Sequence, residues 1–227
     1  MLFSDVADRV AEARARIGDA VARGGHAQQV TLIAVTKTHG PEAVAAAWEA
    51  GVTDVGENRV QEAVAKMAEV GVPVRWHLIG HLQRNKVRQL DDFALLHAVD
   101  SARLADAVHA HGVARGRAVD ALLQVNVSGE TSKGGYAPGE LRAEAERLTT
   151  MPGVRVCGLM TMAPFGASEE VLRTTFGGAR EACAVVRDAG HPARVLSMGM
   201  SDDFEIAVEE GATHVRLGTI LFGARAR

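Results

Sequence analysis

Residues 30–60 read VTLIAVTKTHGPEAVAAAWEAGVTDVGENRV and contain one complete unit of strand, helix and strand. The first segment, Val30–Thr36, is apolar and rich in β-branched residues, which indicates a buried strand. Pro41 and Gly51 then bracket a helix, because proline favours the first helical turn and glycine the position just past the last. A short apolar segment, Thr53–Val55, predicts the next strand. Since a helix joins the two strands, we expect them to run parallel.

The same unit recurs to the end of the chain. The expected strands are Val30–Thr36, Thr53–Val55, Val74–Ile79, Leu95–Val99, Val119–Val127, Val154–Met160, Arg194–Leu196 and His214–Leu217. The expected helices are Val6–Ala22, Pro41–Ala50, Val60–Glu69, Ala102–Ala114, Gly139–Thr150, Ser168–Ala189 and Asp202–Glu210. Continuously apolar strands joined by helices indicate a parallel sheet that is covered on both faces. Eight such units predict an α/β fold, a (β/α)8 TIM-type barrel with an extra N-terminal helix. A doubly wound open sheet is the alternative, but no G-x-G-x-x-G fingerprint follows the first strand.

The composition is that of a globular protein of 227 residues, and no Pro- or Ser-rich linker divides it, so we expect a single domain over residues 1–227. The 25 Lys and Arg residues against 28 Asp and Glu residues give a net charge of −3, which argues against nucleic-acid binding. No uninterrupted apolar run reaches the ~18 residues of a membrane span, and the first residues do not resemble a signal peptide. The two cysteines form neither a disulfide framework nor a metal knuckle. We therefore expect a cytoplasmic protein without a metal site.

Functional side chains of such a barrel lie where its strands end, at their carboxyl termini. Lys37 stands there, directly after the first expected strand. A lysine in apolar surroundings is costly in its charged form, and one that loses its proton becomes a nucleophile toward aldehydes. The alternative is a lysine whose ammonium group simply reaches the solvent at the barrel mouth.

The segments after the seventh and eighth strands predict a phosphate site. Ser201 is a natural N-cap of the following helix, and Gly218 and Thr219 follow the last strand. Barrels of this type often bind phosphate there, on backbone N–H groups that glycine leaves accessible. Taken singly, each of these residues is better explained by an ordinary turn or cap. A reactive lysine opposite a phosphate site suits a phosphorylated aldehyde, of which pyridoxal 5'-phosphate (PLP) is the obvious one.

Seven blocks of sequence, in order, also resemble a known family. They are AVTK (34–37), GENRVQE (56–62), WHLIGHLQRNK (76–86), SKGG (132–135), GLMTM (158–162), LSMGMSDDFE (196–205) and VRLGTILFGAR (215–225). With them the sequence resembles the pyridoxal phosphate homeostasis protein family, single-domain relatives of the alanine racemase barrel. The resemblance implies a protein that binds PLP and takes part in vitamin B6 homeostasis.

The resemblance implies a role for each matching residue. Lys37 forms the Schiff base with PLP, Ser201, Gly218 and Thr219 hold the phosphate, and Arg216 faces the pyridine nitrogen.

Four further residues receive roles from the same resemblance. Asn58 lies beside the cofactor, and His77 and Met200 line its pocket. Lys133, in a loop near the mouth, is implicated in loading or transferring PLP.

Two functions remain open for such a protein: a PLP carrier without catalytic turnover, or a PLP-dependent amino-acid racemase. Racemisation by two bases needs an acid–base group on each face of the substrate carbon. In the related racemases a second domain supplies a tyrosine, whereas this sequence ends directly after the eighth unit and its single tyrosine is Tyr136. We therefore expect a monomeric carrier that delivers PLP to apo-enzymes.

Overall fold

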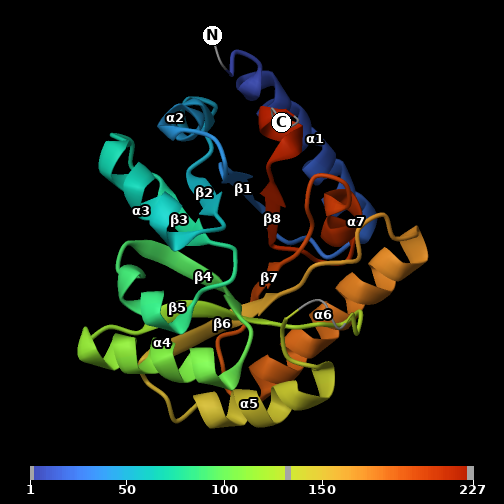
Figure 1. Ribbon diagram of the computed structural model, residues 1–227. Helices are drawn as coiled ribbons and strands as arrows, with labels where there is room; N and C mark the ends of the chain where they lie inside the picture. The colour runs from blue at the N-terminus through green and yellow to red at the C-terminus, as the bar shows by residue number, and fades with distance from the viewer. Residues whose placement is uncertain (1–2, 131–133, 224–227) are drawn as a thin grey trace.

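Eight parallel strands close into a barrel in the computed structural model, which describes residues 3–130 and 134–223 (Figure 1). The strands are β1 (Thr31–Val35), β2 (Asp54–Glu57), β3 (Arg75–Leu78), β4 (Phe93–Val99), β5 (Val119–Gln124), β6 (Val154–Met160), β7 (Val195–Ser197) and β8 (His214–Leu217). Each strand pairs with the next along the chain, and β1 also pairs with β8, which closes the sheet. This arrangement confirms the predicted TIM-type barrel.

Helices surround the barrel and cover the outward faces of its strands (Figure 1). They are α1 (Val6–Gly24), α2 (Pro41–Glu49), α3 (Val60–Glu69), α4 (Ala102–Ala114), α5 (Leu141–Leu148), α6 (Glu169–Asp188), α7 (Phe204–Glu209) and α8 (Thr219–Phe222), with 3-10 helices η1 (Arg84–Gln89) and η2 (Pro138–Glu140). Strand residues on both faces are buried, as in Ile33 and Ala34 of β1, because one face packs inside the barrel and the other against helices. The continuous apolar runs in the sequence have this origin.

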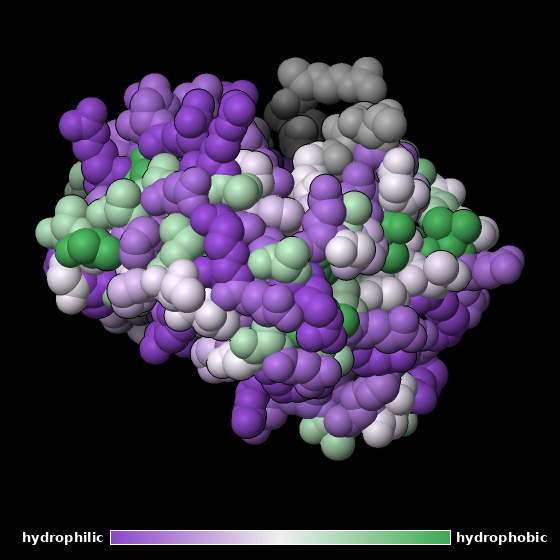
Figure 2. Space-filling view, turned by 90° about the horizontal axis from the view of Figure 1, so that it is seen from below, coloured by the Kyte–Doolittle hydropathy of each residue, from purple (hydrophilic) through white to green (hydrophobic). Residues whose placement is uncertain are grey.

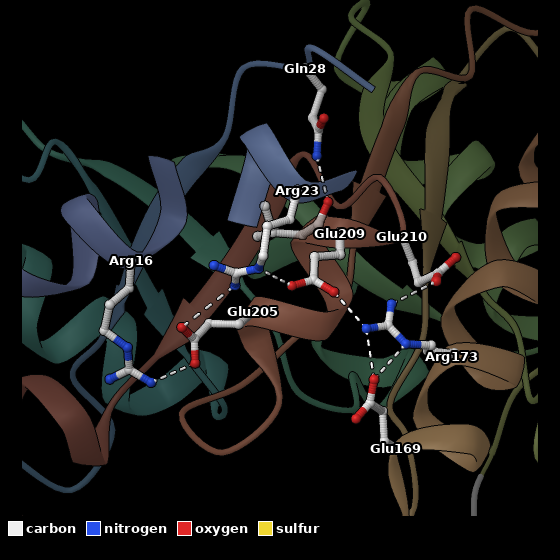
Figure 3. Close-up of polar contacts among 9 residues, drawn as sticks. Arg16, Arg23, Gln28, Glu169, Arg173, Glu205, Glu209 and Glu210 are labelled. Atoms are coloured by element: carbon white, nitrogen blue, oxygen red, sulfur yellow. Dashed lines mark hydrogen bonds and ion pairs between the residues drawn. The ribbon is translucent and has the colours of Figure 1, made fainter. Parts of the chain in front are cut away.

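The expected N-terminal helix is present as α1, which packs against α7 and α8. Its arginines form ion pairs with α7: Arg16 lies 2.8 Å from Glu205 and Arg23 2.6 Å from Glu209 (Figure 3). Glu209 also contacts Arg173 of α6 at 2.6 Å. These contacts fasten α7, the helix that follows the segment after β7, to two neighbouring helices.

The molecular surface is mainly hydrophilic on the face drawn in Figure 2, where apolar residues occur in small, separated groups. Large apolar side chains are instead buried between barrel and helices, as with Phe176 and Phe204. None of the helices in the part of the chain that the structure describes combines the length and hydrophobicity of a membrane span.

Candidate functional site

A cavity of about 720 Å³ opens at the carboxyl ends of the strands. Its walls come from segments that follow different strands, among them Lys37 after β1, Asn58 after β2, Met200 and Ser201 after β7, and Thr219 after β8. The barrel thus gathers residues that are far apart in the sequence into one site, at the end where such barrels carry their chemistry.

Lys37 is half-buried in the turn that follows β1. The peptide groups on both sides of it are bound to α3. Lys66 Nζ donates to the Thr36 carbonyl oxygen at 2.7 Å, and the Thr38 N–H donates to Glu62 Oε1 at 2.7 Å. Thr38 has a φ of 69°, a left-handed conformation that is strained for a β-branched residue. The contacts from α3 therefore hold the turn that presents Lys37 to the cavity.

Lys66 belongs to a buried cluster behind this turn, and the partly exposed Glu62 lies 3.3 Å from it. Glu57 Oε1 lies 2.6 Å from Lys66 Nζ and accepts a hydrogen bond from Thr36 Oγ1 at 2.6 Å. Burial raises the pKa of the Glu57 carboxyl, against the opposing effect of Lys66 and Thr36. Burial would also raise the pKa of Glu62, but the Thr38 N–H and Lys66 outweigh it and lower that pKa. The sequence analysis assigned no role to the residues of this cluster. The position of Glu57, an acid at the end of an apolar strand, indicates a residue near the functional end of the barrel.

Arg216 of β8 lines the cavity with only 5% of its surface exposed. Its Nη1 donates to Ser197 Oγ at 2.6 Å and its Nη2 to the Thr161 carbonyl oxygen at 3.0 Å. Burial lowers the pKa of Arg216 to about 10, so the guanidinium is charged at neutral pH. The site therefore contains a fixed positive charge inside the barrel, in addition to Lys37.

Ser201, Gly218 and Thr219 line the cavity together, from the segments after β7 and β8. Ser201 Oγ accepts a hydrogen bond from the Ile220 N–H of α8 at 3.3 Å, which joins the two segments. The turn before Ser201 requires a glycine: Gly199 has a φ of 93°, and a Cβ there would lie 2.7 Å from Ala207 Cβ. Hydroxyl groups and the first N–H groups of a helix, which lack partners inside the helix, are donors that suit an anion.

Of the other residues named from the sequence, Asn58 and Met200 line the cavity. The residues that line it, among those the structure describes, do not include His77, which is 3% exposed. Side chains two positions apart on a strand share a face, and Ile79 is the cavity residue on the face of His77. His77 therefore lies one layer deeper in the barrel than its predicted place. Lys133 lies outside the described residues.

Further polar and aromatic groups at the cavity had no assigned role. His81 and Asp100, which follow β3 and β4, line it as a pair with His81 Nδ1 2.7 Å from Asp100 Oδ2. Their position after strands was a signal for the site. Phe165, which is 95% exposed, also lines the cavity, and no pattern in the sequence indicated it.

The side chain of Tyr136 is buried, with 7% of its surface exposed. Its hydroxyl group donates to Glu144 Oε1 at 2.8 Å, and burial together with this contact raises the pKa of Tyr136 far above its usual value. In the described part of the chain, the lining of the cavity does not include it.

Comparison with known proteins first defines the class of barrel. Residues 16–226 match the family model described as "Alanine racemase, N-terminal domain". Alanine racemase from Corynebacterium glutamicum superposes with a TM-score of 0.76 at 18% identity, over 99% of this chain and 62% of that chain. At this identity the likeness concerns the fold alone. The chain is thus a barrel of the alanine racemase N-terminal class.

Two closer relatives narrow the class to a family. The pyridoxal phosphate homeostasis protein of Pseudomonas aeruginosa is 42% identical over 226 residues, which cover 98% of this chain and 97% of that protein. PipY of Synechococcus elongatus PCC7942, solved with PLP bound, is 38% identical with a TM-score of 0.85, over 96% of this chain and 100% of that chain. The chain belongs to the pyridoxal phosphate homeostasis protein family, as the sequence blocks predicted. The P. aeruginosa relative is named as a homeostasis protein and not as an enzyme.

Proposed function

We propose that the protein binds PLP in the cavity at the carboxyl ends of the strands and takes part in vitamin B6 homeostasis by holding PLP and delivering it. One observation carries the proposal: Lys37, Arg216, Ser201 and Thr219 line a single cavity. The amine can attach to an aldehyde as a nucleophile, the guanidinium can donate to a pyridine nitrogen, and the two hydroxyl groups can donate to a phosphate. The family membership of the chain supports the same ligand.

The cavity residues fit this ligand chemically. When bound, PLP supplies a reactive aldehyde and an electron-withdrawing pyridine ring. Lys37 is the amine that attaches to the aldehyde as a Schiff base, while Ser201, Gly218 and Thr219 bind the phosphate. Apolar side chains such as Val35 also line the cavity, where they can pack against a ring.

Arg216 has a distinct part in this proposal. A guanidinium only donates hydrogen bonds, and with a pKa of about 10 this one keeps its proton at neutral pH. Facing the ring nitrogen, Arg216 would leave that nitrogen unprotonated and the ring a weaker electron sink. This favours storage of the cofactor over chemistry on an amino acid.

A carrier without catalytic turnover agrees better with the site than a racemase does. A racemase needs acid–base groups on both faces of the substrate carbon. The hydroxyl group of Tyr136 donates to Glu144 instead, and its raised pKa leaves almost no phenolate at neutral pH to act as a base. In this proposal Lys37 is the base on one face of the substrate carbon, and Tyr136 does not serve as the base on the other face.

Delivery requires that a recipient can reach the cofactor. Lys37 is half-buried rather than enclosed, and Phe165 and Met200 at the same cavity are exposed. We propose that the protein acts as a cytoplasmic monomer whose recipients are PLP-dependent apo-enzymes. The part of Lys133 in this transfer stays a prediction.

The experiment that tests the proposal separates carrier from racemase. The PLP-loaded protein is incubated with L-alanine or L-serine in deuterated water, and exchange of the α-proton and inversion are followed. In parallel it is mixed with a PLP-dependent apo-enzyme, whose activity reports transfer. We expect transfer without inversion, and Lys37→Ala is the control that lacks the attachment. Inversion at tens per second or more, as in working enzymes, would contradict the carrier.

A further inference from the structure

A chain of buried polar side chains runs through the inside of the barrel to Arg216. His77 Nε2 lies 2.8 Å from Asp54 Oδ1, and His77 Nδ1 lies 3.0 Å from His97 Nε2. His97 Nδ1 lies 2.8 Å from Ser197 Oγ, which accepts a hydrogen bond from Arg216 Nη1 at 2.6 Å. The exposed fraction of these five residues is at most 5%. This hydrogen-bonded series of side chains ends at the cavity in Arg216. The attachment of PLP to Lys37, as proposed above, does not involve Asp54, His77, His97 or Ser197.

When each histidine ring carries one proton, the Asp54 end of this series of side chains determines the direction of every hydrogen bond in it. Arg216 can only donate, so Ser197 Oγ accepts from it, which leaves the serine proton available for His97 Nδ1. The Asp54 carboxylate can only accept, so His77 presents its proton on Nε2. His97 must then donate from Nε2 to the bare Nδ1 of His77. Both histidines are thereby assigned the Nε2–H form.

The charges along the chain agree with this direction. Burial lowers the pKa of His97 well below its usual value, so His97 is neutral. Burial would raise the pKa of Asp54, but hydrogen bonds from His77, Arg75 and Thr53 outweigh it and hold that pKa well below its usual range. The chain therefore carries a negative charge at Asp54 and a positive charge at Arg216.

A third histidine, His214, lies beside this hydrogen-bonded series of side chains. The ring centroid of His214 lies 6.3 Å from that of His77. Burial lowers the pKa of His214 to about 4, so it adds no charge near neutral pH.

We propose that Ser197, His97, His77 and Asp54 are positioning residues for Arg216. Through this directed chain Ser197 becomes an acceptor for one N–H of the guanidinium, while the Thr161 carbonyl oxygen accepts another. Two acceptors thereby fix the orientation of the guanidinium inside the barrel. This inference rests on the proposed function in one respect, that Arg216 faces the ring nitrogen of PLP.

The first test needs no PLP, and its readout is taken on the unsubstituted protein. The full chain is labelled with ¹⁵N-histidine, and the protonation of each ring nitrogen is read by NMR between about pH 6 and about pH 8. Signals are assigned with His97→Gln and His77→Gln. We expect both histidines to carry their proton on Nε2 and none on Nδ1. A proton on His97 Nδ1, or a doubly protonated ring at either position, would reverse the direction and overturn the inference.

The second test measures the effect on bound cofactor. Ser197→Ala removes the acceptor, and Ser197→Thr keeps a hydroxyl group. Thr175→Val removes a buried hydroxyl group that donates to the Val171 carbonyl oxygen of its own helix, α6. We expect Ser197→Ala to raise the Kd for PLP about tenfold, the effect of one hydrogen bond to a charged group, and to change the pH profile of the absorption of bound PLP. Ser197→Thr and Thr175→Val should keep both properties. An unchanged Kd and an unchanged profile in Ser197→Ala would overturn the inference.

The two tests distinguish failure of this inference from failure of the proposed function. If the unsubstituted protein does not bind PLP, the proposed function fails, while the NMR experiment still decides the direction of the chain. If PLP binds and Ser197→Ala does not fold, the same experiment decides alone.

Discussion

Ser201 and Thr219 present hydroxyl groups to the same cavity, and phosphate is the group they suit. Charge-assisted hydrogen bonds to phosphate contribute roughly 1.5–3 kcal/mol each, so the loss of several must weaken binding by orders of magnitude. Pyridoxal, which lacks the phosphate, should therefore bind far more weakly than PLP to the same preparation. Titration followed by absorbance measures both affinities. Equal affinity for the two ligands would remove the phosphate site from this account.

A residue of the site could be predicted from the sequence where it comes shortly after the end of an expected strand. Lys37, Ser201 and Thr219 needed only that rule, and they line the cavity. His77 is buried and is not among the described residues that line the cavity, since depth along a barrel strand depends on register, which a sequence does not display. His97 was missed for a related reason, since its partner Ser197 lies 100 positions away in the chain.

Helix α3 holds the turn at Lys37 through hydrogen bonds that involve Glu62 and Lys66. Glu62→Ala removes the acceptor of the Thr38 N–H at a strained residue, so the turn should lose its fixed conformation. We expect the Kd for PLP to rise about tenfold and the attachment to slow, as stopped-flow absorbance would measure. Glu69→Ala, an exposed position on the same helix, is the matched control and should behave as the unsubstituted protein does. If Glu62→Ala binds PLP at the original rate and affinity, the contact of Glu62 with the Thr38 N–H does not position Lys37.

Elements with strong apolar patterns were predicted closely, as with β6 and β8, whose bounds agree with the expected ones. β2 was expected to end at Val55 but continues to Glu57. Gly56 resembled a strand end, yet it lies inside β2, where a Cβ would be 3.0 Å from Ile33 Cγ2. Crowding inside the barrel, rather than a turn, explains that glycine. The four-residue α8 was not expected, because so short a helix has no periodicity to detect.

The molecule as a whole should lose stability in mild acid. Burial lowers the pKa of His214 to about 4, and the unfolded chain titrates this group near 6.5. Between these values the unfolded chain binds more protons than the folded one, so stability falls as the pH is lowered from about 6.5 toward about 4. His97 adds to this effect, since its pKa is lowered as well.

Urea unfolding at about pH 7.5 and about pH 4.5 measures this loss. The variant His214→Gln should lose less stability over the same interval, which separates the histidine from the carboxyl groups that titrate nearby. An identical loss in the variant and the unsubstituted protein would contradict the assignment to His214.

The central claim for the whole molecule is that the barrel brings Lys37 to PLP as its point of attachment. The most direct measurement is reduction of the PLP-loaded protein with borohydride, followed by proteolysis and mass spectrometry of the labelled peptide. Reduction makes the link between amine and aldehyde permanent, so the label reports which lysine carried the cofactor. The account predicts a single label on Lys37 and none in Lys37→Ala. A label found only on another lysine, such as Lys86 or Lys133, would contradict it.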